Sequence, residues 1–134
     1  MKARLRSALA DDRGAASAEL VIALALVMLV VMAAAQFALW SHATHIAQAA
    51  ASQGLAASRV QDGTADDGRR AAQYLLDQLA SGPLSDESIS SKRGDVSASV
   101  RVFGTATAVV PFVRLPVHAE AAGPVERFLP DGAP

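Results

Sequence analysis

Residues 19–36 read "ELVIALALVMLVVMAAAQ", a stretch that contains the longest apolar run of the sequence. Its first and last residues are polar, and every residue between them is apolar. The apolar character extends to Ser41, and no Asp, Glu, Lys or Arg occurs between Glu19 and Arg59. A helix over residues 20–41 would be about 33 Å long, which matches a hydrocarbon core of about 30 Å. The sequence therefore predicts one membrane-spanning helix, with Trp40 as an interfacial anchor at its far end.

The charges before the apolar run predict its orientation. Two acids, Asp11 and Asp12, accompany an excess of basic residues: Lys2, Arg4, Arg6 and Arg13. Basic residues favour the cytoplasmic side of a membrane. We therefore expect residues 1–18 in the cytoplasm and the chain after His42 outside it.

A secretory signal peptide is an alternative interpretation of the same segment. It would consist of the basic start, an apolar stretch over residues 20–32 and the small residues 33–35, which resemble an A-x-A cleavage site. Mature protein would then begin near Gln36. A plain signal anchor without further processing is the other alternative.

The helical pattern continues beyond the predicted membrane. Residues 36–60 contain no proline and a single glycine, so we expect one helix from about Ser17 to about Arg59. Small residues recur every three or four positions: Ala43, Ala47, Ala50, Gly54 and Ala57. Such a stripe suits close packing against another helix, although alanine also serves simply as a good helix former.

The segment before the apolar run carries a second pattern. Gly14 is followed by four small residues and then Glu19. A cut after Gly14 would make Glu19 the fifth residue of the mature chain, immediately before the apolar helix. The basic leader, the glycine and the glutamate at this spacing resemble the processing site of type IV prepilins.

The short leader and the Arg-Gly pair are similar to the TadE-like family of tight-adherence (Flp-type) pilus systems, and the ending "GPVERF", residues 123–128, is also similar to alanine-rich members. Two positions depart from the family pattern. Leu20 stands where an aromatic residue often follows the glutamate, and Ala25 stands where members often carry proline. The alanine predicts a straighter helix.

The resemblance implies cleavage by a prepilin peptidase on the cytoplasmic face. Glycine before the cut has no Cβ to obstruct the enzyme. The new amine of Ala15 would lie at the membrane edge, where Glu19 of an adjacent subunit could neutralise it and fix the register of packed helices. Alternatively, Glu19 is an interfacial residue that the helix dipole favours at a helix start.

Residues after Val60 predict a small α+β domain. Thr64 is a suitable N-cap for an amphipathic helix that ends at Gly82-Pro83. Apolar residues then alternate with polar ones over residues 96–110 and 113–121, which predicts two long strands, with a weaker strand around residues 87–91. Pro116 indicates that the last strand is an edge or is bulged. We expect a pilin-like fold: a membrane helix extended into a long helix, a second helix and a small antiparallel sheet.

Composition narrows the classes of function. The 134 residues include no cysteine, and the net charge is −1. There is no thiolate metal site or cysteine nucleophile, and the charge gives no reason to expect nucleic acid as partner. His42 and His45 lie one helical turn apart, but no carboxylate or cysteine nearby in sequence completes a metal site.

The resemblance to the TadE-like family thus implies a non-enzymatic, membrane-anchored minor pseudopilin that acts in pilus assembly through helix packing. We expect four segments: a leader (1–14), the membrane helix and its extension (15–60), an extracytoplasmic domain (61–122) and a tail (123–134). The expected partners are the membrane, a prepilin peptidase and other pilins, with no cofactor, metal or small-molecule substrate. The alternatives are a secreted small α+β binding domain and a plain single-pass membrane protein.

Overall fold

The computed structural model describes residues 12–127. The elements, in order, are α2 (Asp12–Arg59), α3 (Ala65–Leu79), β1 (Leu84–Arg93), β2 (Ser97–Ala106) and β3 (Leu115–Pro124). The predicted α+β class, with a long apolar N-terminal helix, is confirmed. Most of the predicted leader and the end of the predicted tail lie outside the described residues.

The chain divides into two compact units, Met1–Ala35 and Gln36–Pro134. The division falls inside the predicted 15–60 segment, at the first polar residue after the apolar run. The described part of the first unit is helical throughout and belongs to α2. That helix is long and apolar enough to cross a membrane.

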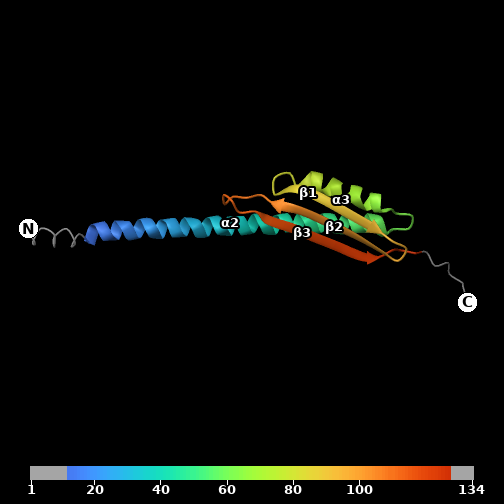
Figure 1. Cartoon of the computed structure of the whole chain (residues 1–134), viewed down its shortest axis with the longest axis horizontal. Helices are drawn as coiled ribbons and strands as arrows, with labels where there is room; N and C mark the ends of the chain where they lie inside the picture. The colour runs from blue at the N-terminus through green and yellow to red at the C-terminus, as the bar shows by residue number, and fades with distance from the viewer. Residues whose placement is uncertain (1–11, 128–134) are drawn as a thin grey trace, which may run out of the picture. The chain divides into compact units, whose positions relative to one another are not determined.

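The second unit contains a three-stranded antiparallel sheet in the order β1-β2-β3 (Figure 1). The predicted weak strand is a full ten-residue strand, β1, which pairs with β2 from Leu84↔Ala106 to Arg93↔Ala98. Strand β3 pairs with β2 along its whole length, from Ser97↔Pro124 to Ala106↔Leu115. Pro116 therefore lies on an edge strand, as its missing N–H requires.

The first long strand is shorter than the alternation predicts, and the second begins two residues later and continues to Pro124. Strand β2 ends at Ala106 and β3 begins at Leu115, so residues 107–114 form a loop. The reason is local: Pro111 has no N–H for a ladder, and Phe112 adopts a left-handed backbone with φ of 67°. The alternation of apolar residues continues in the sequence beyond Ala106, into a loop whose backbone cannot pair with a neighbouring strand.

One face of the sheet is buried against the helices. The core draws on all five elements, and Val100 and Val102 of β2 are fully buried at its centre. Figure 1 shows β1 to β3 lying along the C-terminal half of α2, with α3 beside β1. The other face of the sheet is exposed and carries mainly polar side chains, as antiparallel sheets with one covered face do.

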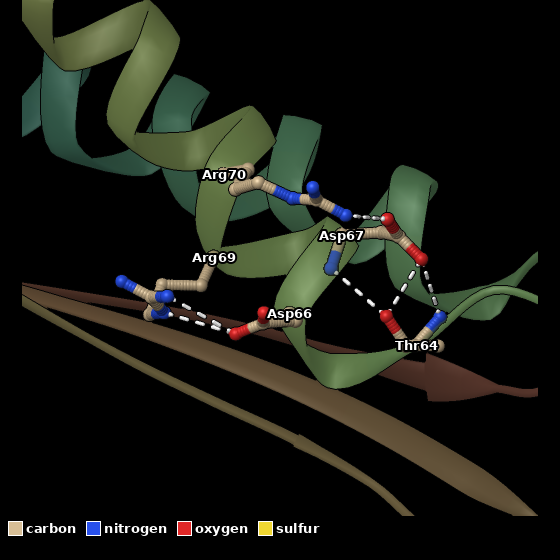
Figure 2. A network of polar contacts seen from close by, with 5 residues as sticks. All are labelled: Thr64, Asp66, Asp67, Arg69 and Arg70. Carbon is tan, nitrogen blue, oxygen red and sulfur yellow. Dashed lines mark hydrogen bonds and ion pairs between the residues drawn. The ribbon is translucent and has the colours of Figure 1, made fainter.

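Helix α3 begins where the sequence predicts, at N-cap Thr64. The Thr64 hydroxyl accepts a hydrogen bond from the Asp67 backbone N–H at 3.1 Å, and the Asp67 carboxylate accepts one from the Thr64 N–H at 2.9 Å. Figure 2 shows this capping box together with the ion pairs Arg69–Asp66 and Arg70–Asp67. The box satisfies backbone donors that the first helical turn would otherwise leave free.

The predicted tail begins inside β3, and its described part is held in place. The Glu126 N–H donates to the Arg59 carbonyl oxygen at 2.8 Å, so the segment closes the C-terminal end of α2. The Val125 N–H donates to the Val96 carbonyl at 3.0 Å. Residues 125–127 of the "GPVERF" segment are therefore part of the folded second unit.

Candidate functional site

The predicted processing residues lie in the first turns of α2. Gly14, Ala15 and Glu19 are all exposed. A Cβ added to Gly14 would meet nothing within 4 Å, so packing within the described chain does not require glycine there. The Ser17 hydroxyl donates to the Gly14 carbonyl oxygen at 3.0 Å. The segment is accessible to another protein, but its helical backbone must unwind before a protease can bind it extended.

Ala15 and Glu19 are four residues apart on this helix. That spacing places two side chains on the same helix face, one turn from each other. An amine created at Ala15 would therefore lie within reach of Glu19 of the same chain, as well as of a neighbouring chain.

The apolar run after Glu19 presents its side chains outward around the whole helix. Leu20 is 69% exposed, Ile22 70% and Leu29 64%. Helices that are apolar on every face need an apolar environment, either lipid or other helices. Most of the large apolar side chains that the described chain exposes belong to this run.

The predicted small-residue stripe is used within the chain. Ala43, Ala47 and Ala50 are fully buried in the core of the second unit. At Gly54 the stripe meets another helix, since a Cβ there would lie 2.7 Å from the Gly68 carbonyl oxygen of α3. Ala57 is half-buried. These residues pack a helix against a helix and a sheet, but the neighbours belong to the same chain.

Gln36 is a site residue that the sequence analysis did not identify. It is 4% exposed. Its Oε1 accepts hydrogen bonds from the backbone N–H groups of Val109 at 2.7 Å and Val110 at 3.2 Å, and its Nε2 donates to the Thr107 carbonyl at 3.1 Å. The signal available in the sequence was its position as the first polar residue after sixteen apolar ones.

Trp40 lies one turn further along α2. Its indole Nε1–H donates to the Pro116 carbonyl oxygen of β3 at 3.1 Å, and its ring centroid lies 5.9 Å from that of Phe37. The predicted interfacial tryptophan thus also ties the helix to the edge strand, leaving Phe37 64% exposed beside it.

The exposed face of the sheet carries a charged pair. Arg101 Nε lies 3.0 Å from Glu120 Oε1. The hydrogen bond from Arg101 lowers the pKa of Glu120, and the hydrogen bond to Glu120 raises the pKa of Arg101. His118 lies against Phe103 on the same face, with ring centroids 5.2 Å apart. Both charges are well solvated, so this pair is a surface feature rather than a reactive centre.

The described residues hold no group of three or more His, Cys, Asp or Glu that could bind a metal ion. His42 and His45 are exposed on α2, and His118 contacts Phe103 instead. What the described geometry offers chemically is an accessible peptide segment, an uncovered apolar helix and a folded domain with a polar sheet face.

Comparison with known proteins identifies a family that part of the chain matches. Residues 14–55 match the family model described as TadE-like protein. No curated protein and no solved structure matches the chain. The match begins at the glycine of the candidate processing site and ends next to Gly54, where α2 meets α3.

Proposed function

Because residues 14–55 of this chain are TadE-like, we propose that it is a minor pseudopilin of a tight-adherence pilus system. It is a non-enzymatic subunit, held by one membrane helix, that takes part in pilus assembly through helix packing. The family match supports a role connected with the pilus, and the finer role is our inference.

The observation that carries this proposal is the spacing of Gly14 and Glu19 at the start of an exposed apolar helix. Nothing in the described fold needs a glycine at position 14 or covers the residues that follow Glu19. Both features are understandable if another protein acts on the segment and other helices or lipids surround it.

Hydrolysis of the peptide bond between Gly14 and Ala15 would release the leader and leave a protonated amine on Ala15. Near an apolar surface such a charge is costly unless an opposite charge pairs with it. Glu19 can supply that charge, one helical turn away in the same chain or across to a neighbour. Pairing across chains would favour one axial register of packed subunits.

The proposed orientation has the leader in the cytoplasm and the second unit outside the plasma membrane. The excess of basic residues before the apolar run supports it. The prepilin peptidase would then act on the cytoplasmic side, while the polar sheet face is presented to partners outside.

Within the proposed assembly, different parts of α2 have different neighbours. The stripe from Ala43 to Gly54 is already covered by the sheet and α3 of the same chain. Contacts with helices of other pilins are therefore assigned to the exposed apolar residues 20–35.

Co-expression with and without the prepilin peptidase of the same system tests the processing step. We expect the peptidase to shorten the chain by the leader, measured as intact mass, and Gly14→Val to block the change. Ala18→Val is the matched control, because it places the same valine side chain at an exposed position of the same helix. Equal cleavage of the Gly14→Val chain, or no cleavage of the natural one, would refute the proposal.

The secreted-domain alternative has one observation in its favour. The division between the two compact units falls between Ala35 and Gln36, where a signal peptidase cut would also fall. The second unit then retains its whole core. The two candidates differ in their product, since this alternative predicts mature protein that begins near Gln36 whether or not the prepilin peptidase is present.

A further inference from the structure

The loop between β2 and β3 has an apolar tip. Residues 108–113 read "AVVPFV" without a polar side chain. Phe112 is fully exposed, and Val109 is 44% exposed. Single exposed apolar residues are ordinary on protein surfaces, but a continuous run of six at a loop tip marks a contact surface.

The backbone conformation of Phe112, at the tip of the loop, is energetically unfavourable. Its φ of 67° lies in the left-handed region, which bulky residues rarely adopt. Its side chain gains no burial within the described chain in return. A residue that is strained and unburied is better explained by a contact with something outside the fold.

Gln36 fixes where this loop lies along α2. Its side-chain amide bonds to three successive parts of the loop backbone, at Thr107, Val109 and Val110. A further N–H, of Val113, donates to the Val110 carbonyl at 3.3 Å. Three backbone N–H groups of the tip, those of Val109, Val110 and Val113, thus have protein acceptors, which favours a position near hydrocarbon.

Counting along the helix gives the depth of Gln36 in a membrane. A hydrocarbon core of about 30 Å takes about 20 helical residues at 1.5 Å each. Starting from Leu20, the far boundary falls near Leu39; starting from Ala15, it falls near Ala34. Gln36 lies within about 5 Å of the boundary in either case, and the loop bonded to it lies at the same level.

We propose that the β2–β3 loop inserts its tip, residues 108–113, into the outer interface of the lipid bilayer beside the exit of α2. The domain would then contact the membrane at two places rather than hang from a single helix. Arg114 follows the tip and is exposed, so it is placed to bind lipid phosphate groups. This inference rests on the proposed membrane anchoring of α2.

The opposite end of the sheet supplies a matched control. Val96, in the β1–β2 turn, is 71% exposed. That turn lies near the C-terminal end of α2, because Arg93 beside it donates to the Val60 carbonyl. Val96 is thus an exposed apolar turn residue roughly 35 Å further along the helix than Gln36.

Single-cysteine variants of the full chain test the insertion, since the natural sequence has no cysteine. Phe112→Cys, Val109→Cys, Val96→Cys and Leu29→Cys are each labelled with a fluorophore in vesicles of phosphatidylcholine and phosphatidylglycerol. Doxyl-labelled lipids quench only fluorophores in or near the bilayer. We expect strong loss of fluorescence at positions 112, 109 and 29, and a loss near background at position 96.

The labelled position in α2 separates the two proposals. Quenching at position 29 without quenching at 112 and 109 would overturn loop insertion while leaving the anchor intact; that outcome would also arise if the tip docks on a partner pilin. Absence of quenching at position 29 would overturn the membrane anchor itself. Equal quenching at 96 and 112 would show non-specific adsorption and would likewise overturn the inference.

Discussion

At the scale of single residues, two glycines set how closely α2 and α3 approach. Gly54 and Gly68 face each other, and a Cβ on either would lie less than 3 Å from the other's carbonyl oxygen. A Cβ on Gly54 would in addition lie 3.1 Å from Cγ1 of Val100 in β2, which is a crowded contact. The stripe of small residues on α2 can be predicted from the sequence. Its neighbours, α3 and the sheet, cannot, because periodicity shows which helix face carries small residues and not which element packs against that face.

Gly54→Ala is expected to destabilise the second unit. The crowding costs about 1–3 kcal/mol, partly offset by about 1 kcal/mol of better helix propensity. The measurement is the midpoint of thermal unfolding in detergent. Gly94→Ala is the control, because its Cβ would meet only the Ser97 carbonyl at an ordinary 3.7 Å. If both variants unfold like the natural chain, the helices are not in the close contact described.

At the scale of elements, two sets of polar contacts stabilise parts of the second unit. One is the capping box of α3, and the other is the set of hydrogen bonds between the Gln36 side chain and the backbone of the β2–β3 loop. The first was predicted in part, since Thr64 and the following acids have the residue types of a helix start. The second could not be predicted, because Gln36 and Val109 are 73 residues apart in the sequence.

The capping box predicts a specific dependence on pH. Hydrogen bonds from the Thr64 side chain, Arg70 and the Thr64 backbone lower the pKa of Asp67 below its ordinary value of 3.8. The carboxylate is therefore bound more favourably in the folded than in the unfolded chain. The resulting stabilisation is fully present above the unfolded pKa and is lost as the pH falls through the lowered one.

Asp67→Asn should accordingly have a lower unfolding midpoint than the natural chain at neutral pH, and the difference should shrink toward zero as the pH falls below about 4. Glu120, whose pKa is also lowered, is present in both chains, and its contribution cancels in the difference. A difference that stays constant across this pH range would show that the carboxylate charge does not stabilise the cap.

Gln36→Leu should loosen the loop. It removes the acceptor of two partly buried backbone N–H groups. Leaving a fully buried donor unsatisfied costs about 1–3 kcal/mol, so we expect a cost toward the lower end of that range for each of these groups. Hydrogen exchange should become faster at Val109 and Val110. Gln48→Leu is the control, since the Gln48 amide is exposed and makes one long bond, 3.4 Å, to the Glu120 carbonyl. Unchanged hydrogen exchange at both amides in the Gln36→Leu chain would argue against the hydrogen bonds from these amides to Gln36.

At the scale of the whole molecule, the features that can be predicted from the sequence are those that depend on a local pattern. The apolar run, the start of α3, the buried alternation of β2 and the TadE-like resemblance all depend on residues close together in the chain. Other features depend on distant contacts: β1 is longer than the predicted strand around residues 87–91 because β2 pairs with it, and residues 125–127 are fixed by Val96, Arg59 and Asp95. Gly14 and Glu19 remain predictions, since their proposed partners are other proteins.

Glu19→Ala separates processing from assembly. We expect the variant to lose its leader and still enter the membrane, but to be incorporated into pili much less than the natural chain. The physical reason is that an unpaired amine at Ala15 disfavours packing in an apolar setting. Glu19→Asp, which keeps the charge, should restore part of the incorporation. Normal incorporation of the alanine variant would refute the pairing.

The central claim is that this chain is a processed pseudopilin anchored by the helix that follows Gly14. The most direct test is the N-terminal sequence of the mature protein, purified from membranes of cells that carry its native pilus system. The account predicts that the mature chain begins at Ala15. A mature chain that begins at Met1 or near Gln36 would contradict it.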